Sequence, residues 1–197
     1  SSRYIELMRR KWKVEERLDT PVLRILRTED DVRLVTDDGE ERFDHVVLAC
    51  HSDQALALLG DASELEHSIL GAIPYQDNDV VLHTDARMLP RKQKTWAAWN
   101  AYVPPVANTG GACTVSYYMN MLQSIDAPEP LVVTLNRTQD IDPDKILARM
   151  SYQHPVYTKL SVNARNRRGA INGLRRTWFA GAYWRYGFHE DGLRSAV

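Results

Sequence analysis

Residues 32–49 read VRLVTDDGEERFDHVVLA, and this stretch decides the fold. Apolar and polar residues alternate on both sides of Asp38-Gly39, which predicts a hairpin, because glycine adopts positive φ without a steric penalty. A third strand-like run, Pro21–Arg27, lies before the hairpin and is separated from it by a short acidic turn. Residues 21–48 therefore predict a three-stranded antiparallel meander, whose last strand we expect over Arg42–Ala49.

The end of this stretch has a different pattern. Residues 46–50 are continuously apolar, which is typical of a strand that is buried on both faces of a parallel sheet. Ser52 or Asp53 can then cap a short helix over residues 53–59. A strand, a turn and a helix in this order predict an α/β fold, here mixed with the antiparallel (α+β) meander.

The middle of the chain, residues 64–160, predicts an inserted domain that is rich in antiparallel sheet. A helix over residues 64–70 leads into strand-like runs divided by polar and proline-rich loops. The expected strands are residues 80–84, 95–102, 112–119 and 131–135. Asp142 and Pro143 then predict a helix through Met150, with Asp142 as its N-cap and Pro143 at its first position.

The two ends of the chain also predict regular structure. Apolar residues at helical spacing indicate an amphipathic helix over residues 4–14. Near the C-terminus, Thr177–Gly181 predicts a short strand, which an aromatic loop over residues 183–188 and a helix from His189 to Val197 follow. The expected domains are residues 1–63 together with 161–197, and residues 64–160.

The composition argues against several classes of protein. The 197 residues include 25 basic and 26 acidic side chains, a net charge of −1 that argues against a nucleic-acid binder. No apolar run approaches the roughly 20 residues that span a bilayer. Cys50 and Cys113 lie in apolar segments, where reduced buried thiols are the simpler interpretation and favour a cytoplasmic protein. The start at Ser1 and the end inside a predicted helix indicate a piece of a longer protein.

Together these residues resemble the flavin-containing amine oxidases, and most closely a bacterial subgroup of amine-oxidase-like predicted NAD/FAD-binding proteins. The resemblance is clear over residues 16–60 and 172–197. The motifs that carry it are Val22-x-x-Ile25, Val32–Glu40, Phe43-Asp44-x-Val46-Val47-x-Ala49, Arg176–Gly181 and Asp191–Ala196. It implies an FAD-dependent oxidoreductase, of which this chain is the C-terminal part.

The resemblance also implies non-covalent FAD and the residues that hold it. In the family, a helix that follows a strand ending in Phe-Ala-Gly begins beside the flavin, whose N1–C2=O2 edge carries partial negative charge. A helix N-terminus offers unpaired N–H groups and a positive dipole end to such an edge. Gly192 and Gly181 would let the backbone approach the cofactor, and Val22 matches the position whose backbone reads adenine. The implied contacts are Val22, Ala49, Gly181, Ala182, Gly187, Glu190, Asp191, Gly192 and Leu193.

Three features depart from the family pattern. The G-x-G-x-x-G motif, which seats the pyrophosphate on a helix N-terminus, is absent from the chain, and the adjacent glycines Gly110-Gly111 follow a polar loop. We therefore do not expect the chain to hold FAD tightly by itself. Ala182 stands where the family often has an acidic residue. No cysteine lies near the closing motif, which excludes a covalent thioether to flavin there.

Two groups of side chains near the closing motif have competing interpretations. Tyr183, Trp184 and Tyr186 match the aromatic residues that flank the substrate channel in amine oxidases, but packing explains such a cluster equally well. The run of residues 189–191, His-Glu-Asp, could suggest metal ligands. Consecutive residues point in different directions, however, so helix capping is favoured and no metal is expected.

We therefore expect an FAD-dependent oxidoreductase that oxidises a C–N or C–H bond of a small-molecule substrate. The inserted domain would form the substrate side through Trp96, Trp99, Tyr102, Tyr117 and Tyr118. A non-catalytic binding or assembly module on the same scaffold is the alternative. We also expect the exposed edges of the parallel sheet to cause self-association, and the backbones of Gly181 and Gly192 to lie close together.

Overall fold

The computed structural model describes residues 2–103 and 114–197, with side chains from residue 5 onward. The expectations for Gly110-Gly111, for Cys113 and for the start of a strand at Ala112 lie outside the described residues. The chain divides into two compact units. Unit 1 comprises residues 1–73 and 158–197, and unit 2 comprises residues 74–157.

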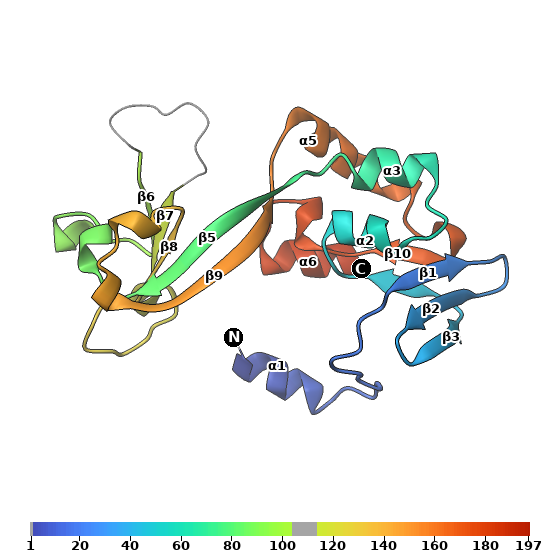
Figure 1. Ribbon diagram of the computed structural model, residues 1–197, viewed down its shortest axis with the longest axis horizontal. Helices are drawn as coiled ribbons and strands as arrows, with labels where there is room; N and C mark the ends of the chain where they lie inside the picture. The colour runs from blue at the N-terminus through green and yellow to red at the C-terminus, as the bar shows by residue number, and fades with distance from the viewer. Residues whose placement is uncertain (1, 104–113) are drawn as a thin grey trace. The chain divides into compact units, whose positions relative to one another are not determined.

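Unit 1 combines short helices with two small sheets (Figure 1). Its helices are α1 (Ser2–Arg9), α2 (Ser52–Leu58), α3 (Glu64–Leu70), α5 (Lys159–Asn166) and α6 (His189–Ala196). Its strands are β1 (Arg24–Arg27), β2 (Val32–Thr36), β3 (Gly39–Phe43), β4 (Val46–Leu48) and β10 (Thr177–Phe179). The helix predicted over residues 4–14 is therefore shorter and ends at Arg9.

The boundary between the units lies later in the chain than residue 64, where the sequence predicted it. Helix α3 was expected to open the inserted domain, but it packs against α2 and α5 of unit 1. Ile69 and Leu70 of α3 are fully buried. Ser63 caps this helix, because its Oγ accepts a hydrogen bond from the backbone N–H of Glu66.

The predicted meander is confirmed, with β1, β2 and β3 paired antiparallel in that order. Gly39 has φ of +132°, which explains why the hairpin has glycine at this position. The prediction of one continuous strand over Arg42–Ala49 is wrong, since β3 ends at Phe43 and β4 begins at Val46. The chain leaves the meander between these residues, because β4 pairs with β10 in a second sheet.

Strands β4 and β10 form a two-stranded parallel sheet, in the register Val46 to Thr177 and Leu48 to Phe179. The predicted parallel strand is thus present. Val46 and Leu48 are buried, whereas Val47 between them is 60% exposed. The expected burial on both faces therefore holds for only one face of β4 in this chain.

A buried arginine links the meander to the parallel sheet through hydrogen bonds. The side chain of Arg27 in β1 is fully buried, and its two terminal nitrogens donate to the Glu66 carboxylate at 2.5 and 3.0 Å. Its Nε donates to Asp61 at 3.0 Å and a terminal nitrogen donates to Thr177 of β10 at 3.4 Å. Burial alone would raise the pKa of Glu66, but the hydrogen bonds from Arg27 and Ser63 outweigh it and hold that pKa below its ordinary value.

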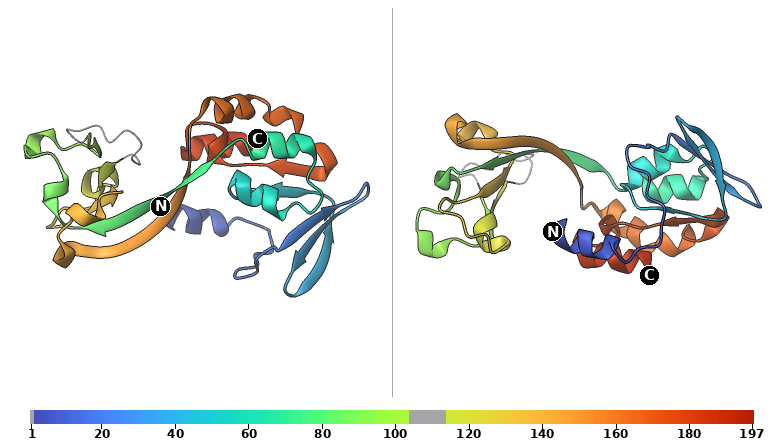
Figure 2. Two further views of the ribbon diagram at one scale, coloured as in Figure 1. Left: turned by 45° about the horizontal axis from the view of Figure 1, so that its top comes forward. Right: turned by 90° about the horizontal axis from the view of Figure 1, so that it is seen from below.

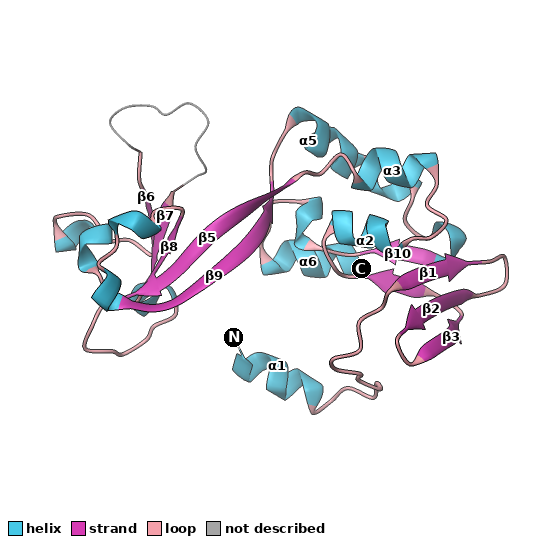
Figure 3. Cartoon of the chain, viewed as in Figure 1, coloured by secondary structure: helices cyan, strands magenta, loops and turns pink. Residues whose placement is uncertain are grey.

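Unit 2 is built on a five-stranded antiparallel sheet with the strand order β6-β7-β8-β5-β9 (Figure 3). The strands are β5 (Tyr75–His83), β6 (Trp99–Ala101), β7 (Val115–Tyr118), β8 (Val132–Leu135) and β9 (Ile146–Pro155), and a short helix, α4 (Met119–Leu122), follows β7. Strands β5 and β9 run side by side along their whole length (Figure 2).

The helix predicted from Asp142 through Met150 is wrong. Asp142 does accept a hydrogen bond from the N–H of Asp144, but it caps only a 3₁₀ turn over Pro143–Lys145. The chain then continues as β9, which pairs with β5. Residues 146–150 alternate between half-buried and exposed positions, so pairing with a long neighbouring strand overrides the local helix signal.

Candidate functional site

The closing motif begins at the carboxyl edge of the parallel sheet. The N–H of Ala180, directly after β10, donates to the carbonyl of Leu48 at the end of β4, at 2.9 Å. Ala49, which is exposed, and Gly181 therefore follow the two strands at the same edge. Open α/β sheets bind their ligands at this edge, outside the carboxyl ends of the strands. The structure thus brings together two of the residues that the sequence predicted as cofactor contacts.

Ser195 joins the strand end to helix α6. Its Oγ accepts a hydrogen bond from the N–H of Gly181 at 2.7 Å and donates to the carbonyl of Gly192 at 2.6 Å. A Cβ on Gly192 would lie 3.8 Å from the backbone N of Ala182. The expectation that Gly181 and Gly192 lie close together is therefore confirmed. Ser195 belongs to the predicted closing motif, but the sequence did not indicate its role, which follows from its place one turn beyond Gly192.

The three glycines of the motif differ in what their surroundings require. A Cβ on Gly181 would lie 2.3 Å from the ring of Tyr183, so the chain itself excludes a side chain there. Gly187 has φ of +91°, a conformation that favours glycine. At Gly192 an added Cβ would make only an ordinary contact. Packing therefore explains Gly181 and backbone conformation explains Gly187, but packing within the described chain does not explain Gly192.

The acidic residues at the start of α6 act within the chain. Asp191 is 8% exposed, and its Oδ2 accepts hydrogen bonds from the N–H groups of Tyr186 and Phe188, at 3.2 and 3.1 Å. Glu190 is exposed and pairs with Arg194 one turn later. The capping interpretation is thus confirmed for Asp191, whereas Glu190 makes an ion pair and no capping hydrogen bond. Within the part of the chain that the structure describes, no group of three His, Cys, Asp or Glu side chains could hold a metal ion.

The aromatic loop divides into buried and exposed residues. Tyr183 and Trp184 are each 5% exposed, and their ring centroids lie 4.9 Å apart. The indole N–H of Trp184 donates to the carbonyl of Phe179 at 3.0 Å. Packing therefore accounts for both side chains. Tyr186 is 75% exposed and Leu193 on α6 is 64% exposed, so these two remain accessible to a ligand.

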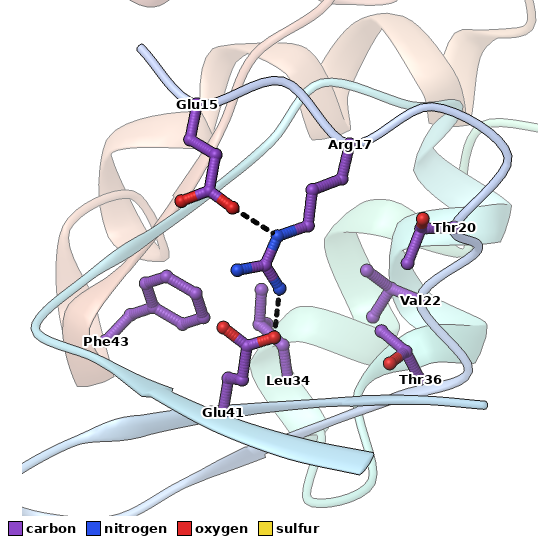
Figure 4. Close-up of a pocket in the computed structure, with 8 residues that line it drawn as sticks. All are labelled: Glu15, Arg17, Thr20, Val22, Leu34, Thr36, Glu41 and Phe43. Carbon is purple, nitrogen blue, oxygen red and sulfur yellow. Dashed lines mark hydrogen bonds and ion pairs between the residues drawn. The ribbon is translucent and has the colours of Figure 1, made fainter. Parts of the chain in front are cut away.

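Val22 lies apart from the closing motif, beside the meander, in the wall of a cavity of about 280 Å³ (Figure 4). The cavity is lined by Glu15, Arg17, Thr20, Val22, Leu34, Thr36, Glu41 and Phe43. Figure 4 shows the guanidinium of Arg17 between the carboxylates of Glu15 and Glu41, to which it donates hydrogen bonds. Two carboxylates outnumber this one cation, so the cavity suits an uncharged group better than a phosphate.

The aromatic residues expected on the substrate side lie on different faces of the unit 2 sheet. Trp99 and Tyr117 are opposed in β6 and β7 with ring centroids 5.2 Å apart. Tyr118, the next residue, points to the other face and packs against Trp96 at 5.1 Å. Tyr102 lies under the guanidinium of Arg137 at 3.8 Å. These five residues therefore do not form one wall.

A buried polar chain, which the sequence did not reveal, crosses the face of Tyr118. The backbone N–H of Asp85 donates to Nδ1 of His83, which fixes the proton on Nε2. That nitrogen donates to Oγ1 of Thr134 at 2.8 Å, and the hydroxyl groups of Thr134 and Ser116 share a hydrogen bond at 2.8 Å. All three side chains are buried, and burial lowers the pKa of His83 to about 4. The chain is therefore neutral at neutral pH.

With this geometry in place, comparison with known families is informative. The family model described as flavin containing amine oxidoreductase matches residues 2–84, which include the meander, β4 and α2. The resemblance that the sequence motifs predicted is thereby confirmed. No curated protein matches the chain.

Solved structures extend the likeness to both units. A CLA-producing fatty acid isomerase from P. acnes has a TM-score of 0.69 and 16% identity over 98% of this chain and 49% of its own. A putative protoporphyrinogen oxidase from Exiguobacterium sp. 255-15 has a TM-score of 0.64 and 18% identity over 99% of this chain and 48% of its own. A triple mutant of putrescine oxidase has a TM-score of 0.55 and 9% identity over 90% of this chain and 48% of its own.

At these low identities the TM-scores show a shared fold and no more, and the predicted mixed α/β class with antiparallel sheets is confirmed. The chain spans about half the length of each of these structures. Among the residues that the structure describes, no helix has both the length and the apolar character that crossing a bilayer requires.

Proposed function

We propose that this chain is part of a longer FAD-dependent oxidoreductase, which oxidises a C–N or C–H bond of a small-molecule substrate. The observation that carries the proposal is the closing motif, in which Ser195 holds Gly181 and Gly192 together at the carboxyl edge of the parallel sheet. Gly192 supports the proposal further, because packing within the chain gives no reason for a glycine there.

The residues of this motif fit the flavin end of FAD. Phe188, His189 and Glu190 at the start of α6 are exposed, so a ligand can reach the first N–H groups of the helix. These groups and the helix dipole stabilise negative charge on the flavin ring. Asp191 contributes by fixing the loop of Tyr186 and Phe188 against the helix. Bound FAD would supply the hydride acceptor, while the chain orients it.

We assign the remaining predicted contacts to the same cofactor. Ala49 leaves space at the edge of the sheet, and backbone atoms of Ala182, Gly187 and Leu193 belong to the motif. The cavity beside Val22 would take the adenine, an uncharged group. Because the sequence has no G-x-G-x-x-G motif, the pyrophosphate would be seated by a segment outside this chain.

The substrate is set by side chains and not by the fold. The names of the similar structures speak of a fatty acid isomerase, a protoporphyrinogen oxidase and a putrescine oxidase, three unlike chemistries on one architecture. We propose that unit 2 carries the substrate side, and that Tyr186 is the aromatic residue of the closing loop that contacts the substrate.

The test is an anaerobic substrate screen on the full-length protein. We expect the purified protein to carry non-covalent flavin, released by heat, and the flavin absorption to bleach on addition of a substrate. A colourless protein that does not take up added FAD would contradict the proposal and favour the non-catalytic module.

We further propose that this chain alone self-associates and that the protein is cytoplasmic. The two-stranded sheet leaves strand edges without partners among the described residues, and Val47 on it is 60% exposed. Cys50 is a free thiol, as a reducing compartment would keep it. Light scattering of the 197-residue chain should show dimers or larger species, and a clean monomer would contradict the first of these proposals.

A further inference from the structure

One face of the unit 2 sheet carries a continuous apolar row. The strand registers place Trp99 opposite Tyr117, Tyr117 opposite Val133, Val133 opposite Leu82 and Leu82 opposite Ala148. Directly opposed residues share a face, so these five side chains cross the sheet from β6 to β9. Trp99 is 55% exposed and the other four are half-buried. We call these five residues the apolar row.

A second set of residues widens this row. Leu135, Val80 and Met150 are opposed to one another, two positions along the strands from Val133, Leu82 and Ala148. Residues two apart on a strand point to the same face. The face therefore carries apolar side chains in both sets and no charged side chain in either.

The opposite face is the buried one, and its fully buried side chains include the apolar Val81 and Val132. It carries His83, Thr134 and Ser116, each at most 1% exposed and hydrogen-bonded to one another. An antiparallel sheet with one face in water ordinarily buries its apolar face and exposes its polar one. Here apolar side chains lie on both faces, and those of the apolar row are the more open. Their contact with water has a cost in hydration that a ligand on this face would remove.

The dimensions and charge of the face define the ligand. Five strands, at about 4.8 Å between neighbours, give the apolar row a length of about 19 Å. A narrow apolar strip of that length matches an extended hydrocarbon chain. A compact diamine is a poorer match, because the strip has no carboxylate to pair with its charge and is longer than such a molecule. We propose that the apolar row binds the long hydrocarbon chain of a lipid-like substrate. This inference rests on the proposed function for the identity of the ligand as substrate.

Two variants in the same strand test the proposal. Ala148 lies in the apolar row, and Ser151 is an exposed residue of β9 on the opposite face. Ala148→Glu places a charge against the hydrocarbon chain and should weaken oleate binding at least about tenfold in calorimetric titration of the protein. Ser151→Glu adds the same charge and should leave the oleate Kd within about twofold. Putrescine should show no binding to any of the three proteins.

A chain-length series and a second pair of variants guard against misfolding of Ala148→Glu. From octanoate to dodecanoate to oleate, each added methylene should tighten Kd by up to about fourfold. Trp99→Ala should weaken oleate about fivefold, whereas Leu147→Ala, which removes a similarly exposed side chain, should not. Equal oleate affinity in Trp99→Ala and wild type, or affinity that is independent of chain length, overturns the proposal.

The outcomes separate this inference from the proposed function. If oleate binds along the apolar row but the full-length protein takes up no flavin, the inference stands and the oxidoreductase proposal fails. If flavin is bound but oleate binds equally to Ala148→Glu and wild type, the inference fails and the oxidoreductase proposal stands.

Discussion

The two units bury polar side chains in opposite ways. Unit 1 buries an ion pair, Arg27 with Glu66, in which both partners keep their charge. Unit 2 buries His83, Thr134 and Ser116 as a neutral hydrogen-bonded chain. The charged pair ties distant segments of unit 1 around the closing motif. The neutral chain lies on the buried face of the unit 2 sheet beside Val81 and Val132, and the apolar row lies on the other face.

This difference separates the two kinds of recognition that the protein is proposed to perform. In unit 1 the candidate contacts are mainly backbone atoms, at Gly181, Gly192 and the start of α6, held in place by side chains. In unit 2 the candidate contacts are apolar side chains that the strand register aligns. Substitutions in unit 1 should therefore act through backbone position, and substitutions in unit 2 through the surface of the sheet.

The largest effect is expected where the buried ion pair is broken. Arg27→Met leaves the Glu66 carboxylate buried without its partner and should lower the free energy of unfolding by about 3–5 kcal/mol. Denaturant titration of the protein, followed by the unfolding of unit 1, measures the loss. Replacing both residues, Arg27→Met with Glu66→Leu, should recover much of it. Arg33→Met, which removes a partly exposed ion pair, is the control, and a loss as large as that of Arg27→Met would refute the account.

The neutral chain of unit 2 should make stability depend on pH between about 4 and 6.5. The pKa of His83 falls from 6.5 to about 4 on folding, so the unfolded state binds the extra proton in this range. The contribution of His83 to the free energy of unfolding is fully present above pH 6.5. It is lost as the pH falls toward 4, by about 3 kcal/mol in all. Hydrogen exchange of the Val81 and Thr134 amides at pH 7 and pH 5 measures it. In His83→Gln the dependence should flatten, and an unchanged slope would show that another group carries it.

The close approach at Gly181 should be sensitive to a single methyl group. Gly181→Ala would force the buried ring of Tyr183 to move and should cost about 1–3 kcal/mol. Gly169→Ala is the matched control, because an added Cβ there meets open space. Thermal unfolding of both variants distinguishes them. Equal melting temperatures would mean that the ring of Tyr183 moves aside without lowering the free energy of unfolding.

The smallest effect is expected at the start of α6. Asp191→Ala removes the acceptor for the N–H groups of Tyr186 and Phe188 and should cost about 1–2 kcal/mol. Glu190→Ala, the adjacent change, breaks only an exposed ion pair and should leave stability nearly unchanged. Denaturant midpoints of the two variants compare the roles directly, and a reversed order would assign the cap to Glu190.

The sequence predicted those parts of the fold whose signals are local. Asp38-Gly39 predicted the hairpin, the apolar run after Asp44 predicted a parallel strand, and the pattern after His189 predicted α6. The helix over residues 142–150 failed, because pairing with β5 outweighs the cap signal at Asp142 and Pro143. The strand expected over Arg42–Ala49 failed because its two halves pair with partners in different sheets.

The candidate site was predicted in part for the same reason. The resemblance of the closing motif identified Gly181 and Gly192 and included Ser195, but it did not indicate that Ser195 joins the two glycines. The partners of Arg27 lie 34 and 39 residues away, and nothing in the spacing links them. The apolar row could not be predicted at all, since it depends on the relative register of five strands.

FAD titration of the full-length protein, stripped of flavin, tests the central claim most directly. The account predicts that Gly192→Ala weakens FAD binding at least about tenfold, because the added methyl group lies where the flavin ring approaches the helix, while alanine inside a helix keeps or raises stability. Gly169→Ala should bind FAD like the wild type. Unchanged FAD affinity in Gly192→Ala would contradict the placement of the flavin at the start of α6.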